Sequence, residues 1–223
     1  MRAIIEYDLL IQTPYHIGTG YGARHIADSL VLTDSRGRLL IHGDTIKGVA
    51  RDALWDLLGR ETDVSKQIFG GREGDRLAGN WVFSHARLSQ DLADLLEKCH
   101  EKQITAPLSG QFLSRAFNKI DENAGRARED HLFRLQMGDL SRFGSNFTGT
   151  VEYIGEEITS SDLISQAAVI VGALRFVRAL GRRRRRGIGR CLFTNFRYHC
   201  DVGCATDSLL DSFAKWVGGN AND

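Results

Sequence analysis

Hydrophobic and polar residues alternate along this chain with two different periods. A period of two, which is typical of half-buried strands, occurs in four segments: residues 2–12, 80–88, 146–155 and 190–199. Apolar residues recur at helical spacing in four other segments: residues 44–58, 91–102, 162–180 and 208–217. The pattern therefore predicts four strands and four helices.

The ends of two of these helices carry residues with known capping preferences. Asp44 precedes the apolar residues of the first helix and is expected to cap it, and Gly59 is expected to stop it. Ser160 or Ser161 is expected to cap the helix at 162–180, and Gly181 to end it.

Two longer segments show neither period. Residues 13–43 are rich in loops, and residues 105–144 are polar, charged and irregular, which indicates an insertion rather than a core element. Without these segments the order is β-α-β-β-α-β, the ferredoxin-like arrangement of an α+β protein. RNA-recognition modules share this core and stack bases on aromatic residues of their sheet, but that aromatic signature is not evident here.

The composition is that of a globular protein with a substantial core. Of 223 residues, 42% are hydrophobic and 26% are charged, and the net charge is +1. Four cysteines are too few for a disulfide scaffold. A transmembrane helix needs about 18 consecutive apolar residues, and no such run occurs. Without a signal-peptide pattern, we expect a cytoplasmic protein that has no membrane partner.

Positive charge is concentrated in one glycine-containing segment. Its members are Arg182, Arg183, Arg184, Arg185, Arg186, Gly187, Gly189 and Arg190. Guanidinium groups match the geometry of phosphate, and glycine lets a backbone pass close to a ligand. The segment therefore favours binding of a polyanion such as RNA. The alternatives are a solvated basic loop and a small phosphate ligand in a ferredoxin-like enzyme.

Four segments, in order along the chain, carry a resemblance to a known family. They are residues 15–20 (YHIGTG), 41–51 (IHGDTIKGVAR), 68–71 (IFGG) with the strand at 81–86, and 180–190 (LGRRRRRGIGR). Together they resemble the RAMP superfamily of CRISPR-associated proteins, most closely the repeated backbone subunit of type III effector complexes. Asp44 and Glu122 depart from the family pattern, the first at the helix start and the second in a thumb-like motif at 118–125.

The resemblance implies one domain over residues 1–223. Its core would comprise residues 1–12, 41–100 and 145–223, with a lid-like loop at 13–40 and a thumb-like insertion at 105–144. Such a subunit polymerises along a CRISPR guide RNA with other effector subunits and further copies of itself. It cuts the complementary target RNA at regular intervals, in antiviral defence.

The family places its cleaving aspartate in the loop after the first strand, and the matching residue is Asp28. RNA cleavage can use the neighbouring 2′-hydroxyl as nucleophile, and a carboxylate can orient that hydroxyl or hold a hydrated divalent cation. The resemblance thus implies weakly held Mg²⁺ or Mn²⁺ at Asp28. His16 and His25 are secondary catalytic candidates; RNA contact or a structural role is the alternative for both. Without the resemblance, Asp28 would be interpreted as a turn residue.

The resemblance also implies sequence-independent contacts to the guide backbone. The expected RNA-binding residues are Lys47, Arg51, Lys119 and the basic segment 182–190. Two other functions stay open. One is a non-catalytic RNA-binding subunit of the same complex, and the other is a metal-independent endoribonuclease that processes the guide.

Overall fold

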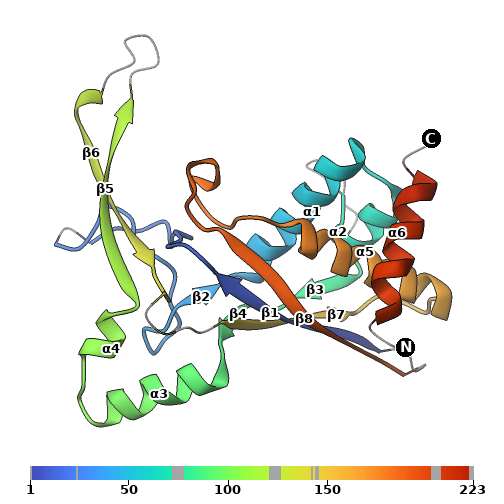
Figure 1. Ribbon diagram of the computed structural model, residues 1–223, viewed down its shortest axis with the longest axis horizontal. Coiled ribbons are helices and arrows are strands. Elements are labelled where there is room, and N and C mark those ends of the chain that lie inside the picture. Colours follow the sequence, from blue (N-terminus) through green and yellow to red (C-terminus); the bar gives the residue numbers. More distant parts are fainter. Residues whose placement is uncertain are drawn as a thin grey trace.

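The computed structural model describes residues 2–23, 25–71, 78–120, 127–141, 143, 146–201 and 207–220. At its centre is a six-stranded antiparallel sheet, formed by β1 (Ala3–Ile11), β2 (Leu40–Ile41), β3 (Trp81–Phe83), β4 (Ala86–Leu88), β7 (Phe147–Tyr153) and β8 (Cys191–Cys200). The strand order is β2-β4-β7-β1-β8, and β3 also pairs with β7. The first long strand therefore lies between the two last ones (Figure 1).

One face of the sheet is covered by helices (Figure 1), namely α1 (Gly43–Leu58), α2 (Asp63–Phe69), α5 (Ser160–Phe176) and α6 (Asp207–Asn220). The principal elements follow in the order β1, α1, β3 with β4, β7, α5 and β8. With β8, β1, β7 and β3 adjacent in that order, this is the ferredoxin-like arrangement. The predicted α+β fold class is confirmed.

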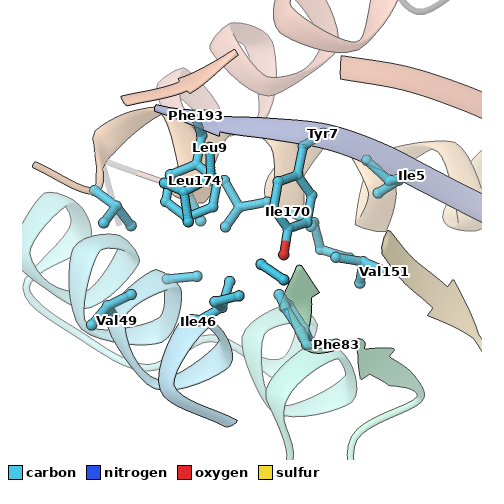
Figure 2. Close-up of a cluster of buried hydrophobic side chains, with 14 of the residues drawn as sticks. Ile5, Tyr7, Leu9, Ile46, Val49, Phe83, Val151, Ile170, Leu174 and Phe193 are labelled. Atoms are coloured by element: carbon cyan, nitrogen blue, oxygen red, sulfur yellow. The ribbon is translucent and has the colours of Figure 1, made fainter. Parts of the chain in front are cut away.

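The main core lies between this sheet and its helices (Figure 2). Every second residue of β1 is buried, and Tyr7 and Leu9 point from it toward the apolar face of α5. Ile170 of α5 is fully buried there, as is Ile46 of α1. Removal of a large aliphatic side chain from such a site costs about 2–5 kcal/mol, so this packing fixes the sheet under the helices.

The opposite face of the sheet carries charged side chains. Arg197 of β8 forms an ion pair of 2.8 Å with Glu6 of β1 and approaches Asp8 at 4.0 Å. Carboxylates repel phosphate, and an RNA-recognition module carries stacking aromatic residues on this face instead. The acidic side chains on this face therefore disfavour contact with an RNA backbone.

The helix boundaries differ from the predicted ones in their caps. His42, not Asp44, is the N-cap of α1, and Asp44 lies in the first turn, where its charge favours the positive end of the helix dipole. The predicted stop at Gly59 is confirmed. The side chain of Thr159, rather than of Ser160 or Ser161, caps α5 by accepting from the N–H of Asp162, and α5 ends at Phe176, well before Gly181.

Several short elements were not anticipated. The predicted strand at 80–88 is divided into β3 and β4 by two intervening residues. Helix α2 begins with a capping box in which Thr62 and Ser65 each bind the other's backbone N–H. Strand β2 lies within the segment predicted to be loop and pairs with β4. Helix α4 (Ala106–Ser109) was also not anticipated; it follows α3 (Gln90–Glu101), which confirms the helix predicted at 91–102.

The largest difference concerns residues 105–144, which were predicted to be irregular. Strands β5 (Phe112–Ile120) and β6 (Ala127–Gly138) form an antiparallel hairpin that projects away from the main sheet (Figure 1). One face of the hairpin is apolar, since Phe117 lies opposite Phe133, and Leu135 and Met137 are buried. The insertion is therefore a structured arm with a small core of its own.

Candidate functional site

The predicted catalytic residue lies at the edge of the hairpin. Asp28 donates its backbone N–H to the carbonyl oxygen of Arg134 at 3.0 Å, and its Oδ2 accepts the backbone N–H of Arg134 at 2.7 Å. The next residue, Ser29, accepts the N–H of Gln136 at 3.0 Å. The loop thereby adds a short extra strand beside β6. Asp28 is exposed, and one of its two carboxylate oxygens is committed to this bond.

The chain approaches Asp28 through a tight turn. Residues Ala23 and Ala27 form a bridge that closes the turn, and His25 lies exposed within it. Gly22 packs against this segment so closely that a Cβ at this position would collide with the carbonyl oxygen of Asp28. The turn therefore leaves His25 on the surface, three positions before Asp28 in the chain.

His16, the other candidate histidine, is only 2% exposed. Its Nδ1 lies 2.6 Å from the carbonyl oxygen of Gln136, and its Nε2 lies 3.1 Å from the hydroxyl of Ser29. A carbonyl oxygen only accepts, so Nδ1 carries the proton, and in the neutral ring Nε2 accepts from Ser29. Burial lowers the pKa of His16, the bond to Gln136 opposes this, and the charge of Arg182 adds to the lowering. His16 is thus a buried residue whose ring connects the loop at 13–40, of which it is part, to the hairpin.

The basic loop at 181–190 lies on the first residues of the lid. Arg182 donates its backbone N–H to the carbonyl oxygen of His16 at 2.8 Å, and Gly189 donates to Pro14 at 2.9 Å. The hydroxyl of Thr13 donates to the carbonyl of Gly187 and accepts the N–H of Arg190 at 2.9 Å. These bonds hold the loop between the hairpin and α1 (Figure 1). The side chains of Arg182, Arg184, Arg186 and Arg190 are exposed.

Arg183 differs from its neighbours in this loop. Its guanidinium carbon lies 4.6 Å from the ring centre of Phe117 and 4.9 Å from that of Phe133, both on the hairpin. Ile188 of the same loop is buried against Leu135 and Met137. The loop and the hairpin therefore share an apolar and cation–π interface.

The predicted basic residues of α1 lie near this loop. Lys47 and Arg51 are one helical turn apart and half-buried. Burial lowers the pKa of Lys47; Asp44 opposes the shift, and Arg51 adds to it. Arg184 of the loop reaches Asp52 of α1 at 3.5 Å, which joins the two basic segments at the surface. The contact is exposed, so it contributes little to stability.

A pair of histidines at the start of α1 was missed in the sequence. The rings of His42 and His85 lie 4.4 Å apart, and Nδ1 of His85 accepts the N–H of Gly43 at 3.1 Å. They lie 43 positions apart in the sequence, so no local motif pointed to the pair.

The structure does not describe every predicted position. The side chains of Lys119 and Arg185 lie outside its described part, and so do residues 121–126, which include Glu122. Among the residues that it does describe, no cluster of three or more histidine, cysteine, aspartate or glutamate side chains is present. Asp28 offers one uncommitted oxygen. That donor set fits a hydrated divalent cation with a single protein ligand and does not fit a tightly bound structural metal. Across the same described ranges, no helix combines the length and apolar character needed to cross a bilayer.

Comparison with known proteins gives the family. The sequence matches the family model of the RAMP superfamily over residues 8–192. None of the curated proteins matches it.

Among solved structures, a subunit in the cryo-EM structure of the type III-B Cmr-beta complex bound to cognate target RNA is similar. The TM-score is 0.62 and the identity 11%, over 87% of this chain and 96% of that chain. A subunit of the apo Cmr-beta complex is similar with a TM-score of 0.61 and 13% identity, over 90% of this chain and 98% of that one. At such identities the structures show a shared fold. Because the family model spans most of the sequence, this chain belongs to the RAMP superfamily.

Proposed function

We propose that this protein is a subunit of a type III CRISPR effector complex that binds guide RNA and cuts the paired target RNA. Membership of the RAMP superfamily supports the effector role, and the shared fold with Cmr-beta subunits, one of them bound to target RNA, supports the type. The observation that carries the cutting activity is the anchoring of Asp28. An exposed carboxylate is held by the hairpin edge, and the next residue, Ser29, is linked through His16 to the loop of exposed arginines.

The RNA backbone lies on the basic surface formed by α1 and the loop at 181–190. Lys47 and Arg51 contribute from the helix, and Arg182, Arg184 and Arg186 from the loop. Arginine binds phosphate through paired N–H donors, whatever the base. Further copies of this chain and other effector subunits continue the surface along the guide.

The reaction is an in-line displacement at phosphorus. The 2′-oxygen of the target ribose forms a bond to phosphorus as the bond from phosphorus to the 5′-oxygen breaks. The 2′-hydroxyl proton goes to the uncommitted oxygen of Asp28, and the 5′-oxygen takes a proton from water or from His25. The products are a 2′,3′-cyclic phosphate and a 5′-hydroxyl. If the uncommitted oxygen of Asp28 holds a hydrated divalent cation instead of taking the proton, that cation would supply charge neutralisation at the phosphate.

The bond between Asp28 and Arg134 serves this step by orientation. Because Oδ2 is occupied by the backbone N–H of Arg134, the other oxygen is directed away from the hairpin edge. A fixed base within reach of its proton contributes far more than a freely rotating one. The carboxylate is thus prepared before RNA arrives.

The guide-processing alternative is less well supported. That chemistry often uses an acid–base histidine; His25 is exposed, but His16 is buried with both ring nitrogens bonded inside the protein. A histidine in that position has no route to a substrate proton.

The test is a map of cuts in a labelled target RNA. The complex is assembled with a defined guide, and the matching RNA is incubated with Mg²⁺, using the parent, Asp28→Asn and Asp28→Ala. We expect evenly spaced cuts for the parent, with 5′-hydroxyl ends, and at least a 100-fold slower rate for both variants. A target with one 2′-deoxyribose at a cut position should resist cutting there alone.

Asp211→Asn is the matched control. It removes the same charge from an exposed site on α6, on the other side of the molecule from the hairpin (Figure 1). Its cutting rate should equal that of the parent. If target RNA is bound but not cut by the parent, the protein is a scaffold and the non-catalytic alternative is correct.

A further inference from the structure

Arg183 has a conformation and surroundings that set it apart from the other basic residues. Its backbone is left-handed, with a φ of 66° and a ψ of 28°. A non-glycine residue pays strain in this region. The side chain lies over two aromatic rings, and its Nε is buried with no hydrogen-bond acceptor among the described residues. Its exposed neighbour Arg182 shares only a more distant contact with one of these rings, 5.8 Å from the centre of Phe133, and its φ is not positive.

The two rings belong to a cross-strand pair of the hairpin. Phe117 and Phe133 lie opposite each other, with ring centres 5.9 Å apart and planes inclined by 26°. The two rings are nearly parallel, and both lie close to the planar guanidinium; we call the pair the platform. Both distances from Arg183 are well within the range of about 6 Å for cation–π attraction.

The platform is connected directly to the candidate catalytic group. Phe133 is followed by Arg134, whose backbone N–H and carbonyl oxygen both bind Asp28. A shift of Phe133 therefore moves the two backbone groups that hold the carboxylate. The path from Arg183 to Asp28 is one ring contact, one peptide unit and two hydrogen bonds.

We propose that Arg183 is not an RNA ligand but a positioning residue, which fixes the hairpin against the basic loop and thereby sets the place of Asp28. This inference rests on the proposed function for its effect on cutting, whereas the fixing of the hairpin is independent of that function. It divides the arginine run by task. Arg184 and Arg186 face the ligand, Arg183 faces the protein, and Arg182 is exposed at the edge of the ring contact, 5.8 Å from the centre of Phe133.

The matched pair of variants is Arg183→Met and Arg186→Met, which remove the same charge three residues apart. Two measurements separate the roles. The first is hydrogen exchange at the backbone amide of Arg134, which reports how firmly the hairpin edge is held. The second is the slope of RNA affinity against salt, which falls by about 0.7–0.9 for each phosphate contact removed.

For Arg183→Met we expect exchange at Arg134 to accelerate about tenfold while the salt slope and the affinity stay as in the parent. Cutting at saturating target should slow by about 10- to 100-fold, since small misplacements have effects of that size. For Arg186→Met we expect the reverse, a smaller salt slope with unchanged exchange. A reduced slope and unchanged exchange in Arg183→Met would show an ordinary phosphate ligand and overturn the proposal.

Two further variants test whether Arg183→Met acts through loss of folding or through the backbone conformation rather than through the lost guanidinium. Arg183→Lys keeps a cation over the rings and should give exchange between that of the parent and that of Arg183→Met. Arg183→Gly relieves the left-handed strain, so it would slow exchange if the backbone alone mattered; we expect it to accelerate exchange. If the parent complex cuts no RNA, the proposed function fails, and the exchange and salt measurements still decide the role of Arg183.

Discussion

Asp28 and Arg134 are 106 positions apart in the sequence and bind each other through two hydrogen bonds, of 3.0 and 2.7 Å. One of these bonds is accepted by the carboxylate itself, so the same side chain carries the charge of Asp28 and holds the hairpin edge. A substitution of Asp28 that keeps a hydrogen-bond acceptor therefore removes the charge but leaves the hairpin edge held. A substitution without an acceptor removes the charge and also releases the hairpin edge.

The first prediction separates these effects. The amide oxygen of Asp28→Asn still accepts the N–H of Arg134, whereas Asp28→Ala leaves that N–H without its partner. Hydrogen exchange at Arg134 should be within about threefold of the parent for Asn and roughly tenfold faster for Ala, because loss of one such bond costs about 1–2 kcal/mol. Equal exchange in the two variants would mean that the carboxylate does not hold the hairpin edge.

The second prediction concerns α1. Lys47→Met and Arg51→Met should each reduce the slope of guide-RNA affinity against salt by about 0.7, because each removes one phosphate contact. The measurement is a titration at several salt concentrations. Lys215→Met removes a positive charge from an exposed site on α6 and serves as the control, which should keep the parent slope. If the salt slope is unchanged in all three variants, the guide RNA does not contact Lys47 or Arg51.

The third prediction is a pH dependence from His16. Burial lowers its pKa in the folded protein below the usual 6.5, so below that pH the unfolded chain binds a proton that the folded chain does not. The free energy of unfolding should therefore decrease as pH falls through 6.5 toward the folded pKa, by at most about 1.4 kcal/mol per pH unit from this group.

Urea unfolding at several pH values of the parent and of His16→Asn measures this contribution. The other histidines are common to both proteins, and the asparagine does not titrate. The stability difference between parent and variant should shrink as the pH falls from 7.5 to 5.5. Parallel curves would show that His16 titrates alike in the folded and unfolded chains.

The fourth prediction compares two glycines of the basic loop. Gly187 and Gly189 have φ values of 75° and 71°, but only at Gly189 would a Cβ collide with a backbone atom, the carbonyl oxygen of Leu180. Gly187→Ala should cost about 1–2 kcal/mol from the left-handed backbone alone. Gly189→Ala should cost more, and each additional kcal/mol lowers the melting temperature by about 2–4 °C. Equal melting temperatures of the two variants would mean that the loop shifts to accommodate a methyl group at Gly189 without further loss of stability.

Local periodicity was sufficient to predict the central elements of the fold. The alternation in β1 and the apolar stripes of α1 and α5 follow from burial on one side, which any sequence must encode in the same way. The cap of α5 was misplaced by one or two residues because Thr159, Ser160 and Ser161 have nearly the same capping chemistry.

The hairpin was missed because its apolar positions are few and are interrupted by charge. Arg115 lies on the same face as Phe117, and its guanidinium lies 5.7 Å from that ring, so a charged residue occupies a position where the pattern expects an apolar one. The alternation of Phe133, Leu135 and Met137 is the signal that was present in the sequence.

The candidate site was only partly predictable for the same reason. Asp28 and the basic loop were identified by motif, but the partners that position them lie on the hairpin. Arg183 was grouped with its neighbours as an RNA ligand because nothing local distinguishes five consecutive arginines. Its aromatic partners become visible only when the two strands of the hairpin are paired.

The position of β1 between β7 and β8 has a consequence for synthesis on the ribosome. Strand β1 emerges first, and its last partner ends only at Cys200. At about 5–20 residues per second, one edge of β1 waits on the order of ten to forty seconds for β8, which pairs with it. A growing chain in this state offers an unpaired strand edge to other nascent chains. The soluble yield therefore depends on the rate at which nascent chains collide, as well as on the stability of the finished protein.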